Sequence, residues 1–348
     1  MRGWTNLSEK TDGMTNIKDV AKQAGVSIAT VSRVLSNKPH VRPEVREQVL
    51  KVIRESGYRP SRIAGNMRNQ SSRIIGVLVS DIRNPFFTAI ARAIEDVAIS
   101  HDMSLFLCNT DEDPLKEEMY LKTLLEERVA GVILSPTKEN TDSFGVLFES
   151  QIPVVTIDRR IEGANIDGVY SNNIPSAQLL TTHLVENGYR NIAALLGLKN
   201  SMTGNERSQG YKLALEQHKL KYNAQFVSYV YPSEVEGEEI VTQWLKLPHR
   251  PDAILTGNSR LTIGALNAIA TAGLKMPNEI GLAGFDETSW MKHAGPGITV
   301  ISQPTYEMGR TAAELLFQRM ADPARPAREV VLKGKLLVRG STNHSLDS

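Results

Sequence analysis

Cysteine is almost absent from this chain. The 348 residues include a single one, Cys108, so neither an internal disulfide nor a cluster of thiolate metal ligands can form within one chain. Cys108 ends the apolar stretch 105–107, and a small buried core residue is the simplest interpretation of it. A lone cysteine also fits a reducing compartment.

Long apolar runs are absent too. No uninterrupted run approaches the roughly 18 residues that span a bilayer, and the polar N-terminus has no apolar signal-peptide core. We therefore expect a cytoplasmic protein that does not enter a membrane.

The sequence also lacks the common enzyme motifs. It contains no Gly-x-Ser-x-Gly elbow, no Gly-x-x-x-x-Gly-Lys phosphate loop and no His-Glu-x-x-His zinc motif. The histidines are isolated, and the adjacent carboxylates Asp286 and Glu287 would point to opposite faces of a strand. These absences predict a protein that is not an enzyme and that uses no cofactor and no metal.

Charge is plentiful but unevenly distributed. The formal net charge is only +1, yet the segment from Met14 to Arg73 holds twelve Lys or Arg and four Asp or Glu. A basic module joined to a mildly acidic body favours phosphate contacts at one end and a different chemistry at the other.

Two short helices are predicted inside the basic module. Apolar residues recur with helical spacing over 17–24, and Gly25 can adopt the left-handed conformation that ends a helix. Ser27 then supplies an N-cap for a second helix, in which Val31 and Val34 face inward. Two helices separated by a glycine-bearing turn form a helix-turn-helix.

A third helix is expected from about Pro43 to Ser56, because proline suits the first turn of a helix and Gly57 its end. The alternative is a plain helical bundle without a DNA-reading role. Against it, the second helix carries short or hydrogen-bonding residues that can enter a major groove, namely Ile28, Ala29, Thr30, Ser32 and Arg33.

Residues 17–35, which read Ile-Lys-Asp-Val-Ala-Lys-Gln-Ala-Gly-Val-Ser-Ile-Ala-Thr-Val-Ser-Arg-Val-Leu, resemble the N-terminal signature of the lactose-repressor and galactose-repressor (LacI/GalR) family. The resemblance implies base contacts from Ile28, Ala29 and Arg33. It implies phosphate contacts from the three hydroxyl residues, Ser27, Thr30 and Ser32. Arginine can donate two parallel hydrogen bonds to guanine, which contribute about 1–3 kcal/mol of discrimination.

The segment 58–68 is similar to the hinge helix of the same family. In that family the hinge folds on operator DNA and places a leucine in the minor groove. Here Met67 stands at the leucine position, and Gly65 replaces a helix-favouring residue at a cost of about 1 kcal/mol of helix propensity. We therefore expect a hinge that depends more strongly on DNA for its order.

From Ser72 onward, short apolar strands alternate with amphipathic helices. Eight strands are expected, at 74–79, 104–108, 131–134, 154–157, 191–196, 253–256, 280–285 and 299–301. Helices are expected between them, for example at 86–100, 117–128, 176–187, 207–218 and 261–272. Unbroken apolar strands separated by helices favour doubly wound parallel sheets, here two α/β lobes with a ligand between them. This body resembles the periplasmic-binding-protein-like sensor domain of the family.

The predicted organisation has five parts. Residues 1–13 are a disordered extension or a consequence of start-site choice, 14–59 the helix-turn-helix domain, and 60–72 the hinge. Residues 73–342 are the sensor and dimerisation domain, with lobe 1 at about 73–172 plus 303–331 and lobe 2 at about 173–302 plus 332–342. Residues 343–348 are a tail.

By resemblance, an effector pocket is expected where polar residues end strands or begin helices, next to an aromatic pair. Trp290 is a candidate stacking platform or, equally, a core residue. The predicted pocket residues are Phe86, Phe87, Asp158, Arg207, Asn258, Arg260, Asp286, Trp290 and Gln303.

One departure from the family pattern bears on the ligand. Sugar-binding relatives carry Asn-Asp where this chain has Asn258-Ser259, and Arg260 follows. Arg159 and Arg160 likewise follow Asp158. Losing a carboxylate and gaining guanidinium groups favours an anionic ligand, so we expect a sugar acid such as gluconate or a keto sugar acid. Salt bridges on the surface or between the lobes are the alternative role for these arginines.

The sequence therefore predicts a regulator, expected to be a repressor of carbohydrate metabolism genes, that binds double-stranded operator DNA as a homodimer. A sugar-like effector would control its affinity for DNA. The alternatives are a neutral or phosphorylated sugar, a purine or a protein co-ligand as effector. A sugar-binding transport protein would need an export signal and no DNA-reading head.

Overall fold

The computed structural model describes residues 16–35, 38–58, 72–137 and 141–343. The chain divides into two compact units, residues 1–71 and 72–348. Each unit is treated separately below. Among the described residues, none of the helices combines the length and the apolar character needed to cross a bilayer.

The first unit is a three-helix module built from α1 (Ile17–Gln23), α2 (Ile28–Leu35) and α3 (Pro43–Ser56). Asn16 caps α1 by accepting hydrogen bonds from the backbone of Lys18 and Asp19. Gly25 has a φ of 62°, the left-handed conformation that glycine adopts without strain, and it turns the chain between α1 and α2. The helices enclose a small core of Val20, Ala21, Ala24, Val31, Val34 and Val49.

The second unit alternates strands and helices. Its strands are β1 (Ile74–Val79), β2 (Ser104–Asn109), β3 (Gly131–Leu134), β4 (Val154–Ile157), β5 (Asp167–Ser171), β6 (Ile192–Leu196), β7 (Val227–Tyr229), β8 (Ala253–Thr256), β9 (Gly281–Phe285), β10 (Thr299–Ser302), β11 (Glu329–Leu332) and β12 (Lys335–Leu337). Its α-helices are α5 (Pro85–Ser100), α6 (Pro114–Glu126), α7 (Gly145–Glu149), α8 (Asn173–Glu186), α9 (Met202–Gln217), α10 (Glu234–Leu245), α11 (Ser259–Thr271) and α12 (Thr305–Ala321). Short 3₁₀ turns lie at Thr141–Phe144, Ala224–Phe226 and Ser289–Lys292.

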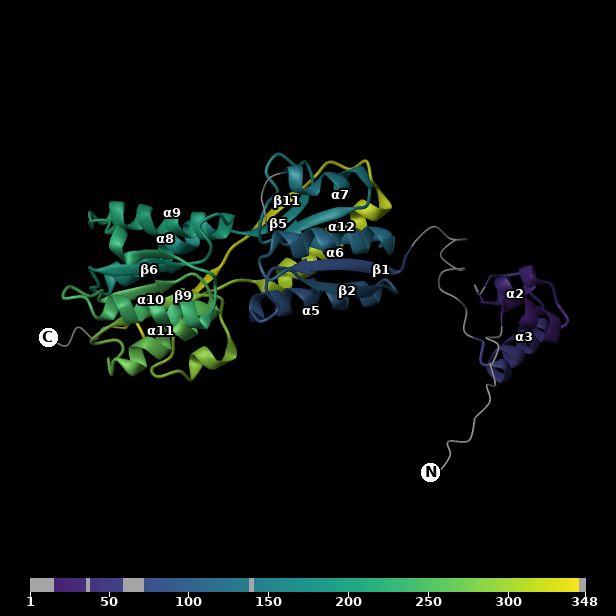
Figure 1. The fold of residues 1–348 in the computed structure, drawn as a ribbon, viewed down its shortest axis with the longest axis horizontal. Coiled ribbons are helices and arrows are strands. Elements are labelled where there is room, and N and C mark those ends of the chain that lie inside the picture. The colour runs from purple at the N-terminus through teal and green to yellow at the C-terminus, as the bar shows by residue number, and fades with distance from the viewer. Residues whose placement is uncertain (1–15, 36–37, 59–71, 138–140, 344–348) are drawn as a thin grey trace, which may run out of the picture. The chain divides into compact units, whose positions relative to one another are not determined.

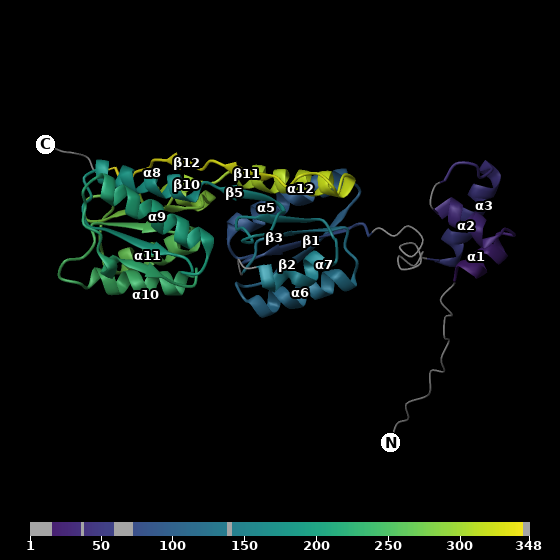
Figure 2. The same cartoon turned by 90° about the horizontal axis from the view of Figure 1, so that it is seen from above.

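These elements form two lobes, each a six-stranded sheet with helices on both faces (Figures 1 and 2). The lobe 1 sheet has the order β11-β5-β4-β3-β1-β2, and the lobe 2 sheet has the order β12-β10-β9-β8-β6-β7. The paired strands run parallel except β12, which is antiparallel to β10. In lobe 1, α5 and α12 cover one face and α6 and α7 the other. In lobe 2, α8 and α9 lie opposite α10 and α11.

The chain passes between the lobes at three places. These are the connections from β5 to α8, from β10 to α12 and from β11 to β12. Figure 2 shows the β11–β12 crossover on one side of the two lobes and α6 and α10 on the opposite side. Because both sheets are parallel, the carboxyl ends of their strands can face each other across the space between the lobes.

The eight expected strands are all present, with ends that differ by at most one residue. The prediction of two doubly wound lobes is confirmed. Four further strands, β5, β7, β11 and β12, were not predicted. β7 and β12 have three residues each, and β5 begins and ends with polar residues, so none of these shows an apolar run.

A buried ion pair joins the last long helix to the lobe 1 sheet. The Nε of Arg319 in α12 donates to Asp167 Oδ2 at 2.9 Å, and the Asp167 side chain is 0% exposed. Arg319 also donates to the backbone carbonyls of Pro323 and Pro326, which precede β11. This arginine therefore fixes both an edge strand and a buried carboxylate.

We predict that Arg319→Ala lowers the free energy of unfolding by about 3–5 kcal/mol, because it leaves Asp167 buried without its cation. The matched control is Arg92→Ala, whose pairs with Glu95 and Asp96 lie on the surface and contribute at most about 1 kcal/mol. Urea unfolding measures both variants. Equal losses in the two variants would contradict this role for Arg319.

Candidate functional site

The first candidate site is the outer face of α2. Ser27, Ile28, Ala29 and Arg33 are exposed, while Val31 and Val34 on the opposite face are buried in the small core. The helix is therefore amphipathic, and its outer face presents an apolar pair beside a guanidinium group. Such a face can follow the edges of bases in a major groove.

Hydroxyl groups at the start of α2 hold the local geometry. The backbone N–H of Thr30 donates to Ser27 Oγ at 3.1 Å, so Ser27 is an N-cap, as the sequence predicts. The side-chain hydroxyl groups of Ser27 and Thr30 are also hydrogen-bonded to each other, with their oxygens 2.9 Å apart. Thr30 and Ser32 are partly exposed. Met67, the predicted minor-groove residue, lies outside the described residues.

The second candidate site is a pocket at the carboxyl ends of the strands of both lobes. Its lining contains seven of the nine predicted pocket residues, Phe86, Phe87, Asp158, Arg207, Asn258, Asp286 and Gln303. The other lining residues are Asp81, Asn84, Glu112, Arg159, Gly197, Leu198, Ser201, Thr203, Gly204, Pro232 and Gly257. The structure therefore brings together side chains that are more than 200 residues apart in the sequence.

Asp158 and Asp286 occupy equivalent places in the two lobes. Asp158 follows β4 and Asp286 follows β9, the third strand in each sheet order. Both residues have a φ of 69°, a left-handed conformation that is uncommon outside glycine. Their backbone N–H groups donate to Val169 O and Ile301 O on the neighbouring strands, which holds the strained turns in place.

Arg207, in the second turn of α9, is a cation whose charge favours the ionised forms of both carboxyl groups. Its Nε donates to Asn173 Oδ1 at 2.9 Å, and its Nη1 donates to Gly257 O. The guanidinium carbon lies 4.3 Å from the centre of the Phe285 ring. The residue is 7% exposed, so packing and hydrogen bonds fix the orientation of its guanidinium group.

Burial raises the pKa of the Asp158 carboxyl group to about 6, despite the opposing effects of Arg159 and Arg207. Burial also raises the pKa of Asp286, while Arg207 and hydrogen bonds from Gln303 and Asn84 oppose the shift. Both shifts arise because desolvation disfavours a charged carboxylate. Additional hydrogen-bond donors in the pocket would therefore stabilise the charged forms of these two carboxyl groups.

Gln303 and the two phenylalanines complete the recognition surface. Gln303 Nε2 donates to Asp286 Oδ1 at 2.5 Å, while its Oε1 is buried and has no partner among the described residues. The rings of Phe86 and Phe87 lie edge to face, with centroids 5.0 Å apart. A free acceptor, two carboxylates and an apolar wall suit a ligand with several hydroxyl groups and a carbon face.

Glu112 was not predicted as a pocket residue, and Arg159 was considered only for its charge. The Arg159 guanidinium binds Glu112 through two hydrogen bonds of 2.6 and 2.7 Å, and both side chains are at most 7% exposed. Asp81, which follows β1, was also missed. Its place after a strand is the same signal that identified Asp158, whereas nothing in the sequence pattern indicates Glu112.

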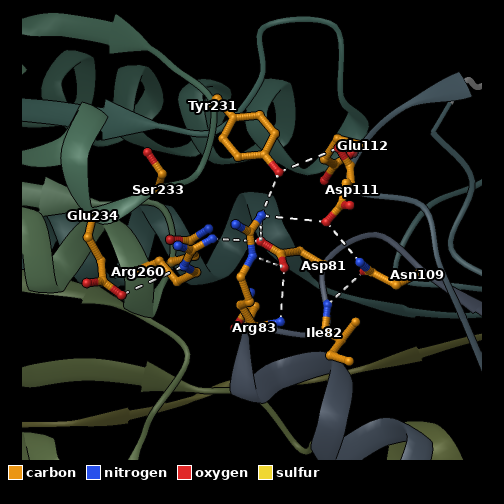
Figure 3. Close-up of polar contacts among 12 residues, drawn as sticks. Asp81, Ile82, Arg83, Asn109, Asp111, Glu112, Tyr231, Ser233, Glu234 and Arg260 are labelled. Atoms are coloured by element: carbon orange, nitrogen blue, oxygen red, sulfur yellow. Dashed lines mark hydrogen bonds and ion pairs between the residues drawn. The ribbon is translucent and has the colours of Figure 1, made fainter. Parts of the chain in front are cut away.

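Two predicted residues do not line the pocket. Trp290 lies in a 3₁₀ turn and packs against the lobe 2 core, which matches its alternative role as a core residue. Arg260 is the second residue of α11, and its Nη1 donates to Asp81 Oδ2 at 2.7 Å (Figure 3). Asp81 belongs to lobe 1, so the interaction is an ion pair between the lobes, the alternative that the sequence left open.

The pocket is small and carries no excess of positive charge. Its volume is about 50 Å³, whereas ligand pockets typically have roughly 300–1,000 Å³. Its charged lining comprises four carboxylates, from Asp81, Glu112, Asp158 and Asp286, and two guanidinium groups, from Arg159 and Arg207. Among the described residues, no three His, Cys, Asp or Glu side chains gather as metal ligands.

Comparison with known families matches both units. Residues 16–61 match the model of bacterial regulatory proteins of the lacI family, and residues 181–342 match that of a periplasmic binding protein-like domain. The chain is 34% identical to the HTH-type transcriptional regulator KdgR of Bacillus subtilis (strain 168), covering 96% of this chain and 100% of that protein. It is 35% identical to a ribose operon repressor of Halalkalibacterium halodurans, covering 94% and 97%.

Solved structures show the same architecture. A lac repressor dimer bound to operator and the anti-inducer ONPF has a TM-score of 0.83 at 26% identity, covering 94% of this chain and 99% of that one. The complex of the transcriptional regulator CelR with cellobiose has a TM-score of 0.72 at 27% identity, with the same coverage. These similarities extend across both units of the chain.

We predict that Asp158→Asn stabilises the protein at pH 8 by about 3 kcal/mol and has little effect near pH 4. The folded pKa of about 6 exceeds the ordinary 3.8, so the stabilising contribution of this carboxyl group is full below pH 3.8 and is lost as the pH rises through 6. Asparagine does not ionise and does not lose this contribution.

Urea unfolding between pH 4 and pH 8 tests this dependence. Glu239→Gln, on the exposed surface of α10, is the control and should leave the pH profile unchanged. A wild-type profile parallel to that of Asp158→Asn would show that burial does not penalise the Asp158 charge.

Proposed function

Because the chain belongs to the lacI family of bacterial regulatory proteins, we propose that it is a repressor that binds operator DNA as a homodimer under the control of a small hydroxyl-rich ligand. Its role as a DNA-binding transcriptional regulator follows from the family. The direction of control, the dimer and the ligand class belong to the proposal. A regulatory rather than catalytic role agrees with the names of its relatives.

The observation that carries the DNA-binding half is the exposed face of α2. Ile28, Ala29 and Arg33 are exposed on the helix that follows the Gly25 turn, which is the geometry of a recognition helix. The net positive charge of this unit adds attraction for phosphate. A sugar-transport protein has no use for such a face, so the structure favours the regulator.

The proposed homodimer has a candidate interface on lobe 1. The lobe 1 sheet ends at β2, an edge strand on which Phe106 and Leu107 are 41% and 45% exposed. Large apolar side chains on an unpaired edge strand mark a surface for association. A second copy of the chain fits this edge, since a symmetric dimer pairs the same patch on both subunits.

The ligand half rests on the pocket between the lobes. Asp158, Asp286 and the unpaired Gln303 Oε1 accept hydrogen bonds, Arg207 donates them, and the two phenylalanines supply an apolar wall. Hydroxyl groups both donate and accept, so a sugar-like molecule satisfies this set. Binding between two lobes can change the angle between them and thereby shift the population of the DNA-binding state.

The sugar-acid hypothesis depended on surplus guanidinium groups. In the structure Arg159 is paired with Glu112, and Arg260 is paired with Asp81, so neither supplies surplus positive charge. Arg207 is the remaining guanidinium group of the pocket lining. A sugar acid would therefore need Arg207 as the partner of its carboxylate, whereas a neutral sugar would not.

We predict that Arg33→Ala weakens binding to a preferred duplex by about 1–3 kcal/mol, roughly 5- to 150-fold, with a smaller effect on random duplexes. Fluorescence anisotropy with duplexes selected from a random-sequence pool measures both affinities. Lys51→Ala removes one positive charge from the same unit and should weaken both duplex classes alike. If Arg33→Ala also weakens both equally, Arg33 contacts phosphate and not bases.

We predict that Arg207→Ala preserves duplex binding and abolishes the response to the ligand, because it removes a guanidinium donor from the pocket lining. A thermal-shift screen of sugars and sugar acids identifies the active ligand, and anisotropy then measures its effect on DNA binding. A normal ligand response in Arg207→Ala would show that the ligand binds elsewhere.

Calorimetry with gluconate and glucose separates the ligand classes. If the sugar acid is the ligand, Arg207→Ala loses gluconate binding, and glucose binds weakly even to the wild type. Tight binding of glucose alone would exclude the sugar-acid hypothesis.

A further inference from the structure

The pocket between the lobes is narrow, and contacts between the lobes border it. A volume of about 50 Å³ has room for a few water molecules, so a sugar ring needs more space than the lobes leave at this separation. The β11–β12 crossover lies on one side of the lobes and can act as a hinge (Figure 2). Contacts on the opposite side would then oppose opening.

An ion pair between the lobes lies at the border of the pocket. Asp81, which follows β1 in lobe 1, accepts from Arg260 Nη1 of lobe 2 at 2.7 Å. The side chains are 6% and 11% exposed. Water therefore screens this pair only weakly, and separating the lobes would strand a partly buried carboxylate and a guanidinium group.

A second contact between the lobes involves Arg83 and Tyr231. The Arg83 guanidinium binds both oxygens of Asp81, at 2.8 and 3.1 Å, and its Nη2 donates to the hydroxyl of Tyr231 in lobe 2 at 3.1 Å. That hydroxyl in turn donates to Asp111 O at 3.5 Å. Figure 3 shows Arg83 close to Asp81, Asp111 and Tyr231, with Arg260 also reaching Asp81.

The turn after β2 connects these contacts to the pocket wall. Asp111 and Glu112 both have left-handed φ values, 52° and 58°, which cost energy in residues other than glycine. The backbone oxygen of Asp111 accepts a hydrogen bond from the Tyr231 hydroxyl of lobe 2 at 3.5 Å, while its neighbour Glu112 binds Arg159 in the pocket lining. A shift of this turn therefore changes a contact between the lobes and a pocket contact together.

We propose that Asp81, Arg83, Asp111, Tyr231 and Arg260 form a latch that keeps the ligand-free lobes closed, and that the Asp111–Glu112 turn couples the latch to the pocket wall. Ligand entry then requires the latch to open, and contacts at Arg159 or Glu112 shift its equilibrium. Arg260 is the principal member, because it supplies the charge that lobe 2 contributes to the latch and is only 11% exposed.

The distance between the lobes in the ligand-free, full-length protein tests the latch. Nitroxide labels are attached at Met119→Cys on α6 and Glu239→Cys on α10, both exposed and on the side opposite the crossover. The native Cys108 is 1% exposed and does not take the label. Co-expression with excess unlabelled chain leaves one labelled chain in each oligomer, and pulsed electron paramagnetic resonance gives the distance distribution.

We expect one narrow distribution for the wild type and a broader one, shifted to longer distances, for Arg260→Gln. Asp81→Asn should produce a similar shift, and combining it with Arg260→Gln should add little, because both remove the same ion pair. The control Arg310→Gln breaks ion pairs that lie within α12 and should leave the distribution unchanged. An unchanged distribution in Arg260→Gln would overturn the latch.

Two further variants complete the test. Far-ultraviolet circular dichroism reports whether Arg260→Gln folds, and if it does not, Tyr231→Phe removes one hydroxyl and should give a smaller shift in the same direction. Glu112→Gln weakens the hold of Arg159 on the turn and should broaden the distribution, whereas a wild-type distribution there would refute the coupling. The measurement uses neither DNA nor ligand, so its outcome is independent of the proposed function.

Discussion

Pairing of buried charges is the constraint on which the second unit depends. Parallel strands place polar residues at their carboxyl ends, and two such sheets face to face bring four carboxylates into one small space. Taking a carboxylate out of water costs several kcal/mol unless a partner compensates. The chain provides Arg159 from lobe 1 and Arg207 and Arg260 from lobe 2. One of these pairs, Arg260 with Asp81, also joins the two lobes.

The two lobes contribute equivalent carboxylates but only one shared cation. Asp158 and Asp286 end corresponding strands with the same backbone conformation, yet Arg207 comes from lobe 2 alone. Neither carboxylate is fully compensated, which is why burial raises the pKa of both. A ligand that donates hydrogen bonds to both groups stabilises their charged forms. In the ligand-free pocket, desolvation destabilises the charged carboxylates, and hydrogen bonds from a hydroxyl-rich molecule would reduce that cost.

The sequence predicted those parts of the molecule that local patterns determine. The three helices of the first unit and strands such as β1 and β4 follow from apolar spacing. Seven pocket residues follow from resemblance, and five of them also from their places at strand ends or helix starts. The partners of Arg260 and Arg159 could not be predicted, because Asp81 and Glu112 reach them only through the packing of sheets distant in sequence. Trp290 was ambiguous because an aromatic residue near a strand end suits a core and a pocket equally well.

The strength of the contacts between the lobes fits a switch better than a permanent lock. Moving an equilibrium from 1:99 to 99:1 requires a difference of about 5.5 kcal/mol in ligand affinity between the two states. Hydrogen bonds to charged groups contribute about 1.5–3 kcal/mol each, so a ligand that contacts Asp158, Asp286 and Arg207 can supply a difference of this size. Arg83 is 55% exposed and holds Asp81 weakly, which leaves one well-buried pair, Arg260 with Asp81, as the main barrier to opening. A single such pair lies within the range that a small ligand can oppose, whereas several of them would fix the lobes in one state.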